Sequence, residues 1–289
     1  MEYENMPQSS NIEDRRGQGG GGGGAVGAGG LGIGAIIIIF AISYFTGISP
    51  QVLMSGAEMV GVGQNSGPPP QAAPVDPNDP TRQFLSRVVG GTEGVWKEVL
   101  PAQTGVQYQP ATLVIYDGAT RSGCGGARSA MGPFYCPIDK KVYLDTSFFR
   151  DMKTKYGGGG DFAYAYVVAH EIGHHVQDLL GILDKVDDAK QRVSQIQANA
   201  LSVRVELQAD CFAGVWANHA NEKWQILQPG DIEKAMATAS AIGDDRLQTA
   251  ARSYAVPDSF THGSSVMRQQ WLTAGLKSGD IKSCNTFSN

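Results

Sequence analysis

Three of the five histidines in this chain lie in one apolar stretch, AYVVAHEIGHHVQDLLG, at residues 165–181. Imidazole and carboxylate side chains are costly to bury unless they have partners. His170 and His174 are four residues apart, so on a helix they lie one turn apart on the same side. Two imidazoles in that arrangement can hold one Zn²⁺ at about 2.0 to 2.1 Å each. The stretch therefore predicts a metal-binding helix, with Glu171 beside the metal but not bound to it.

Residues 170–174 form the H-E-x-x-H pattern that occurs in zinc proteases. Because short patterns also arise by chance, the alternative is a pair of core histidines bonded to backbone carbonyls. The metzincin continuation is excluded, since it requires Gly and His where this chain has Gln177 and Leu180. Asp178 lies about 12 Å from His170 along a helix axis, too far to share one tetrahedral site. A third ligand must come from another segment.

Glu206 and Asp210 form an acidic pair one helical turn apart in the stretch VRVELQADCFAGVWA. A lone pair of this kind is normally a solvated helix face, but the surrounding residues are largely apolar. The stretch resembles the second helix of gluzincins, which carries an E-x-x-A-D pattern. That resemblance implies that Glu206 is the third zinc ligand. It also implies that Asp210 accepts the outer N–H of a ligand histidine, which would fix its tautomer.

A wider resemblance rests on five separated blocks. They are SGCGGARSAMGPFYCPIDKKVYLD (residues 122–145), the histidine stretch, ELQADCFAGVWA, AIGDDRLQ and FTHGSSVMRQQW. From about residue 81 to the C-terminus, the chain resembles the bacterial putative neutral zinc metallopeptidase family. The resemblance implies a zincin-like metallopeptidase domain, one zinc ion per chain and attachment to a membrane.

His262 and Arg268 are further candidates for the site. A similar His and downstream Arg follow the metal helices in the membrane-embedded zinc proteases that carry H-E-x-x-H and E-x-x-x-D motifs. By that analogy His262 would donate to the oxyanion, and Arg268 would bind substrate or brace the site. Gly263 departs from the analogy, because those proteins usually have Pro there. A capping or surface role is the alternative for His262.

The stretch FYCPIDKKVYLD alternates in polarity around a tight turn and predicts a hairpin. In zincins an edge strand above the active-site helix pairs with the substrate backbone, and Lys141–Asp145 is the candidate here. An internal strand is the alternative. The chain is thus expected to be an α+β protein, mostly helical, with a small antiparallel sheet packed against the histidine helix.

The first 80 residues differ in composition from the rest. Residues 1–24 read as a disordered, Gly-rich tail, and residues 49–80 as a Pro/Gly-rich linker before the metallopeptidase domain at 81–289. Residues 25–48 carry no charge and would span about 36 Å as a helix, enough for a hydrocarbon core of about 30 Å. A cleaved signal peptide is the alternative, although this stretch is long for one and no clear A-x-A site follows it.

The charges that flank residues 25–48 predict an orientation. Arg15 and Arg16 precede the stretch, and the next Lys or Arg is Arg82. By the positive-inside rule, we expect a single-pass protein of the inner (cytoplasmic) membrane. Its N-terminus would be cytoplasmic and its catalytic domain periplasmic or extracellular. The net charge of −5 argues against a nucleic-acid partner.

The four cysteines all lie in the part expected to be exported, where disulfides persist. Three complete pairings are open. Cys124 with Cys136 closes a short loop and is favoured, which would leave Cys211 with Cys284. A cysteine zinc site has no C-x-x-C spacing to support it.

These observations predict a membrane-anchored zinc peptidase that hydrolyses peptide bonds. His170, His174 and Glu206 would hold the zinc, and Glu171 would act as general base toward a zinc-activated water. The partners would be a peptide or protein substrate and a membrane protein kept close by the tether. The alternative is a non-catalytic, membrane-tethered binding or scaffold protein with a structural zinc, which would need a fourth protein ligand.

Overall fold

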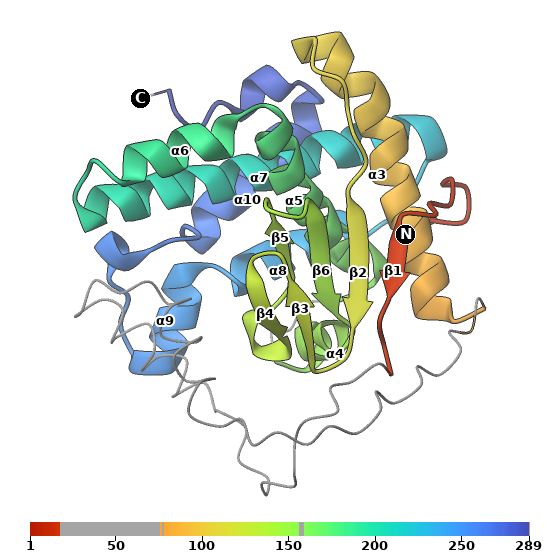
Figure 1. Cartoon of the computed structure of the whole chain (residues 1–289), viewed down its shortest axis with the longest axis horizontal. Helices are drawn as coiled ribbons and strands as arrows, with labels where there is room; N and C mark the ends of the chain where they lie inside the picture. The colour runs from red at the N-terminus through yellow and green to blue at the C-terminus, as the bar shows by residue number, and fades with distance from the viewer. Residues whose placement is uncertain (18–75, 77, 156–158, 289) are drawn as a thin grey trace, which may run out of the picture.

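The computed structural model describes residues 1–17, 76, 78–155 and 159–288. Its helices are α3 (Pro80–Thr104), α4 (Ser147–Lys155), α5 (Asp161–Leu179), α6 (Ile182–Lys190), α7 (Gln195–Trp224), α8 (Asp231–Ala241), α9 (Asp244–Arg252) and α10 (Ser265–Ser278). Short 3₁₀ turns are η1 (Ser129–Met131), η2 (Pro257–Ser259) and η3 (Ile281–Cys284). Figure 1 shows the small sheet at the front, with helices behind it and α3 along one side. The predicted mostly helical α+β architecture is confirmed.

The main sheet has the strand order β1 (Ile12–Asp14), β2 (Thr112–Tyr116), β6 (Lys141–Asp145), β5 (Phe134–Cys136). The hairpin of β5 and β6 is antiparallel and confirms that prediction. However, β2 is parallel to both β1 and β6, so the expected antiparallel sheet is wrong. The physical reason is that the chain already reverses through β5 before it reaches β6, which therefore enters the sheet in the direction of β2.

Strand β6 is internal, because β2 and β5 bond to its two sides. Lys141–Asp145 is therefore not the edge strand that was expected to pair with substrate. The free edge on this side of the sheet belongs to β5.

Alternate side chains of β2 and β6 face two different apolar clusters. Those that face the helices and join the main core are Leu113, Ile115, Val142 and Leu144. Those on the opposite face join a smaller cluster with Cys136 and Ala127; they are Val114, Tyr116 and Tyr143. Ala127 lies in a second hairpin, β3 (Ala119–Ser122) with β4 (Gly125–Arg128), which covers this face of the sheet.

Two disulfides fix segments that are distant in sequence. Cys124, at the tip of the β3–β4 hairpin, is bonded to Cys136 of β5. Cys211 of α7 is bonded to Cys284 of η3 and so ties the C-terminal turn to the long helix. The favoured pairing is confirmed, and among the residues that the structure describes there is no free cysteine.

Residues 1–17 are part of the folded domain, so the predicted disorder of residues 1–24 is wrong for them. Met6 is completely buried in the main core, and the α-amino group of Met1 lies 3.2 Å from the buried carboxylate of Asp231. The side chains of Ser9 and Asn11 donate to Glu93 Oε1 of α3 at 2.6 and 2.8 Å. These contacts bury both apolar and polar groups, which a disordered tail would leave in water.

The expected anchor, residues 25–48, lies outside the described residues, as do residues 18–24 and most of the linker. In the described part of the chain, no helix has the length and apolar character needed to cross a bilayer. β1 and β2 pair directly, so residues 1–17 and the body lie together. The predicted topology, with a single crossing between them, would require that pairing to open.

Candidate metal centre

The H-E-x-x-H segment of α5 and the E-x-x-A-D segment of α7 meet where both helices carry small residues. A Cβ added to Gly173 would lie 3.0 Å from Ala209 O and 3.2 Å from Ala209 Cα. The backbones therefore approach closely, since neither position has a large side chain. This contact brings one turn of each helix into register and places their polar side chains opposite each other.

His170, His174 and Glu206 meet at this contact, and one ligand atom from each lies within 4.8 Å of the others. The Nε2 atoms of His170 and His174 lie 3.2 and 3.6 Å from the Glu206 carboxylate. The two rings are nearly perpendicular, with centroids 4.8 Å apart. Two imidazoles and one carboxylate form the donor set of many catalytic zinc sites. Among the described residues, no fourth candidate ligand joins the group.

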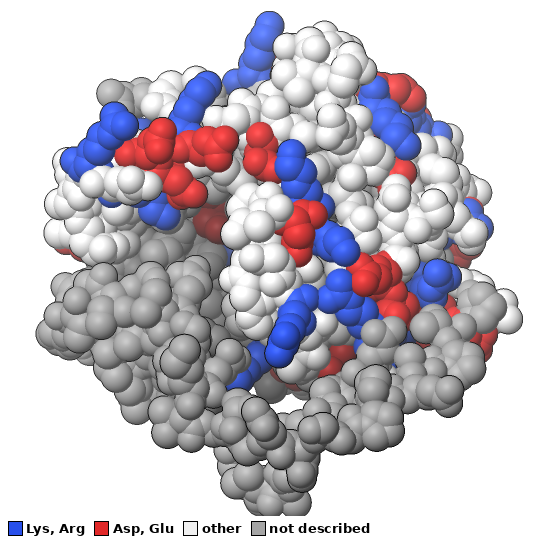
Figure 2. All heavy atoms as spheres, in the orientation of Figure 1, with Lys and Arg blue, Asp and Glu red and all other residues white. Residues whose placement is uncertain are grey.

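The site is open on one side. The His170 side chain is nearly buried, whereas the Glu206 side chain is 20 % exposed. Figure 2 shows the surface hollowed below α6, beside the strands of Figure 1, with acidic side-chain atoms on the floor of the hollow. Positive and negative side chains are interspersed over the rest of this face (Figure 2). A ligand can therefore reach the site from solvent.

Asp210 fixes the tautomer of His170. Its Oδ1 accepts a hydrogen bond from His170 Nδ1 at 2.8 Å, which leaves Nε2 of the neutral ring with a free lone pair toward Glu206. Burial lowers the pKa of His170, but the charges of Asp210 and Glu206 raise it to about 10. The surroundings therefore favour a cation at this position, which a bound metal ion would satisfy.

Asp210 is itself fully buried and held by two further groups. Tyr166 OH donates to its Oδ1 at 2.6 Å, and Arg268 donates to both oxygens at 2.8 and 2.9 Å. Burial raises the pKa of Asp210, but the charges of Arg268 and His170 hold it below its usual range. The carboxylate thus remains ionised and oriented toward His170.

Arg268 is buried and bonded within the protein, which favours the bracing role in the prediction over contact with substrate. Its side chain is 4 % exposed, and its guanidinium is occupied by Asp210, Tyr166 and the backbone carbonyl of Ile242. The alternative part of the prediction, that Arg268 braces the site, describes these contacts.

Glu171 is buried beside the two ligand histidines. Loss of hydration raises its pKa above the usual value, although the charges of His170 and His174 oppose that shift. A carboxyl with a raised pKa can take a proton and pass it on near neutral pH.

His262 lies at the rim of the site, on the segment between α9 and α10. Asp244 holds this segment by accepting the backbone N–H groups of residues 261–263. Gly263, with φ of +94°, lies against Val203 and Leu207 of α7, near Glu206. Partial burial lowers the pKa of His262, but the hydrogen bond to Asp244 and the charge of Glu206 raise it above the usual value.

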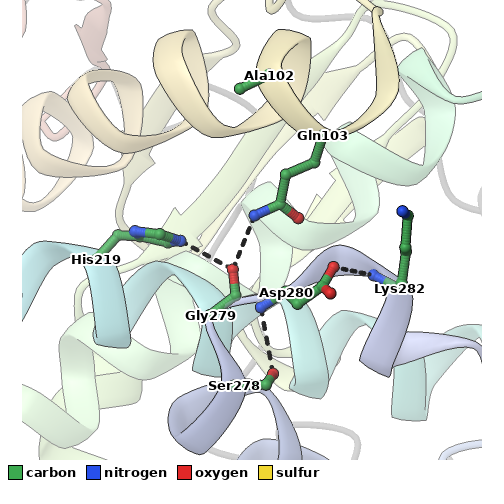
Figure 3. Close-up of a pocket in the computed structure, with 7 residues that line it drawn as sticks. All are labelled: Ala102, Gln103, His219, Ser278, Gly279, Asp280 and Lys282. Atoms are coloured by element: carbon green, nitrogen blue, oxygen red, sulfur yellow. Dashed lines mark hydrogen bonds between the residues drawn. The ribbon is translucent and has the colours of Figure 1, made fainter.

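Other candidate side chains lie outside the site. His175 bonds to Tyr135 and to Gln109 O, which give it a structural role. Asp178 accepts from Tyr135 OH and takes no part in the metal group. A pocket of about 410 Å³ includes His219, about 20 Å farther along α7 than Glu206. Figure 3 shows its polar groups bonded to one another, with His219 and Gln103 both donating to Gly279 O.

Four further residues of the site are not predicted from the sequence. Tyr166 and Gln177 lie one turn before His170 and one turn after His174, so helical spacing could have pointed to both. Gln208 lies between Glu206 and Asp210 and bonds to Gln177. Asp244 follows Gly243, a pattern typical of a helix start, and nothing in this local sequence indicates the bond to His262.

Comparison with known proteins gives a family and several relatives. A model of a family described as "Putative neutral zinc metallopeptidase" matches residues 1–287. The uncharacterized protein YpfJ of Escherichia coli K12 is 45% identical over 292 residues, which cover 99% of both chains. The uncharacterized proteins Mb2605 of Mycobacterium bovis and Rv2575 of Mycobacterium tuberculosis are each 44% identical over 223 residues, or 73% of both chains. No solved structure matches the chain.

Proposed function

The chain belongs to the putative neutral zinc metallopeptidase family, and from that premise we propose that it is a zinc-dependent endopeptidase. The observation that carries the proposal is the arrangement at the α5–α7 contact. There, three ligand atoms from His170, His174 and Glu206 lie within 4.8 Å of one another, and Glu171 lies next to them. A purely structural zinc would be expected to have four protein ligands.

The donor set fits zinc. Each histidine uses its outer nitrogen in a hydrogen bond, His170 to Asp210 and His174 to Gln177, so both Nε2 atoms are available. Burial raises the pKa of Glu206, but the two histidines hold it well below the usual value, so this side chain is ionised. When bound, zinc would supply a Lewis acid that polarises a carbonyl and lowers the pKa of a water toward about 7.

Glu171 is the proposed general base. Its carboxylate would take a proton from the attacking water and pass it to the amine that leaves. The raised pKa of Glu171 suits both steps, because the group must bind the proton and then release it. Burial beside two imidazoles also keeps the side chain close to the reacting atoms.

His262 is the proposed donor to the oxyanion of the scissile carbonyl. Asp244 Oδ1 lies 3.3 Å from His262 Nδ1, so Nε2 of the protonated ring is free to donate. Because the His262 side chain is 53 % exposed, it can reach a group bound in the hollow. A positioned donor of this kind is worth about 2.7–4 kcal/mol in the transition state.

The edge of β5 is the proposed docking site for the substrate backbone. β5 ends the sheet on this side and contacts α5, the helix that carries the histidines. An extended peptide could add to Phe134–Cys136 as a further strand, with affinity from main-chain hydrogen bonds. This proposal replaces the internal strand Lys141–Asp145.

We also propose that residues 25–48 attach the protein to the inner membrane, near a membrane protein that is its substrate or partner. The proposal rests on the sequence of this stretch, which has no charged residue and is largely apolar, so it can enter the hydrocarbon core of a bilayer.

The test is cleavage of an unbiased peptide library by the full chain, because residues 1–17 supply a strand of the sheet. The native protein is compared with Glu171→Gln at equal zinc content. Cleavage by the native protein alone is the expected result, and the cut sites would define the preferred sequences. Equal cleavage by both would remove Glu171 from the mechanism. Zinc held one to one without cleavage by either would favour a binding module.

A further inference from the structure

His174 is connected to the C-terminal turn through two buried glutamines. His174 Nδ1 lies 2.8 Å from Gln177 Oε1. Gln177 Nε2 donates to Gln208 Oε1 at 3.0 Å, and Gln208 Nε2 donates to Cys284 O at 3.0 Å. Gln177 is completely buried and Gln208 is 6 % exposed. We call the two side chains and the Cys284 carbonyl the amide relay.

The Cys284 carbonyl, at one end of the amide relay, determines which group donates in every hydrogen bond of the relay. Cys284 O can only accept, so the amide nitrogen of Gln208 must face it and the amide oxygen must face Gln177. Gln177 therefore donates to Gln208, and its Nε2 also donates to Val205 O at 2.8 Å. Its oxygen is left to accept from His174 Nδ1. In the neutral ring, His174 Nε2 then carries the lone pair, which is the state a metal ligand needs.

The Cys284 carbonyl, which we call the anchor of the relay, is fixed to α7, the helix that carries Glu206. Cys284 is bonded to Cys211 of α7, one turn beyond Gln208. Thr286 Oγ1 donates to Arg204 O at 2.7 Å on the same helix. The Cys284 carbonyl is thus held at a fixed position relative to Glu206. Because Gln208 and Gln177 connect this carbonyl to His174, its position also fixes the orientation of the His174 ring.

We propose that Gln177 and Gln208 are positioning residues for the metal ligand His174, and that the Cys211–Cys284 disulfide holds the anchor of their relay. His170 is oriented by the charged Asp210, whereas His174 is oriented by neutral amides, so the relay acts through geometry and tautomer rather than charge. The proposal rests on the proposed metal site but not on peptidase activity.

The test measures the zinc dissociation constant of the full chain by competition with a chelator, without substrate. Gln177→Met keeps the approximate volume and removes the acceptor for His174. Gln208→Met leaves Gln177 in place and removes its link to Cys284. Loss of an outer partner of a ligand histidine typically weakens metal binding about 10–100-fold. We expect Gln177→Met in that range, Gln208→Met to be weakened less, and the fold of both variants to be intact by circular dichroism.

Gln103→Met is the matched control. Gln103 also ties the C-terminal turn, by donating to Gly279 O (Figure 3) and accepting from Ile281 N. Neither bond involves Gln177, Gln208 or Cys284 O. Its zinc affinity should equal that of the native protein. Equal weakening in Gln103→Met and Gln177→Met would overturn the proposal, because any loosening of the turn would then suffice.

Further results distinguish failure of the positioning role from failure of the proposed metal site. Reduction of the disulfides should weaken zinc binding in the native protein and much less in Gln177→Met, where the relay is already broken. Native affinity in a folded Gln177→Met variant would overturn the positioning role alone. Failure of the native chain to bind zinc would instead overturn the proposed metal site itself.

Discussion

At the residue scale, Asp210 connects His170 of the candidate metal centre to the buried side chains of Tyr166 and Arg268. It accepts from His170, Tyr166 and Arg268, and no water-exposed surface remains on it. A buried carboxylate with this many donors stays ionised and holds the imidazole in one tautomer. Because the carboxylate of Asp210 and the guanidinium of Arg268 are both buried, each charge requires the other as its partner.

Arg268→Met tests this arrangement, because it leaves the Asp210 charge without its guanidinium. Removal of one partner from a buried ion pair costs about 3–5 kcal/mol. We expect a loss of that size in the free energy of unfolding of the zinc-free protein, measured with urea. A surface control such as Arg246→Met should change stability little. If Arg268 contacted substrate instead, the variant would keep its stability and show only a higher KM.

The His262–Asp244 pair predicts how kcat/KM falls on the alkaline side of its pH profile. Because Nδ1 faces Asp244, Nε2 carries a proton only in the imidazolium form, so activity should fall as pH rises through the pKa of His262. The carboxylates of Asp244 and Glu206 raise that pKa above its usual value, which extends activity to higher pH.

Asp244→Asn should therefore move the alkaline limb of the kcat/KM profile to lower pH, since it removes the nearer charge. His262→Ala should abolish that limb and reduce the maximum. Asparagine can still accept backbone N–H groups, so the 261–263 segment should stay in place. An alkaline limb at the native position in both variants would exclude His262 as the donor.

The residues of the candidate metal centre could be predicted from sequence because they come in local pairs. His170 with His174 and Glu206 with Asp210 are both one turn apart, and helical geometry alone puts each pair on one face. The partners Arg268 and Gln208 could not be assigned in this way, because their bonds depend on how α5, α7, α10 and the C-terminal turn pack together.

At the element scale, the site depends on the close approach of α5 and α7 at Gly173 and Ala209. Gly173→Val would place side-chain atoms against the backbone of α7 and push the helices apart. We expect zinc affinity to fall by at least about tenfold, since the ligands from the two helices would no longer converge, and we expect a stability loss of about 1–3 kcal/mol from overpacking. Isothermal titration and urea unfolding measure the two effects.

Gly181→Ala, just beyond the C-terminal end of α5, is the control, because nothing lies within 4 Å of an added Cβ there. Its backbone φ of +65° makes alanine unfavourable, so it should lose stability but keep zinc affinity. A native zinc affinity in Gly173→Val would show that the α5–α7 distance does not set the site.

The helices and strands differ in how clearly they can be predicted from the sequence. The histidine helix and the β5–β6 hairpin have strong periodicity and turn signals, and both form as expected. Strand β1 has only three residues, Ile12–Asp14, two of them acidic, and has no strand signal of its own. It forms because β2 offers a free edge and because Lys141 and Arg15 pair with Glu13.

At the scale of the whole molecule, β1 makes the N-terminal segment and the body one unit. The segment also places Met6 in the core and the α-amino group of Met1 beside Asp231. Any membrane attachment through residues 25–48 must then leave residues 1–17 and 78–288 on the same side. A single crossing by residues 25–48 would put them on opposite sides, because neither the length of the stretch nor the charges that flank it take account of strand pairing.

Site-specific labelling in intact cells decides between these topologies. All four cysteines are paired, so a single new cysteine at Ser10→Cys or at Asp188→Cys gives one reactive thiol on an exposed side chain. With a membrane-impermeant maleimide, we expect both variants to react equally before the cells are permeabilised, or both to react only afterwards. Permeabilised cells provide the control for intrinsic reactivity. Labelling of only one variant in intact cells would show that β1 leaves the sheet when the protein is in the membrane. The domain would then work with a vacant edge at β2, which a partner strand could fill.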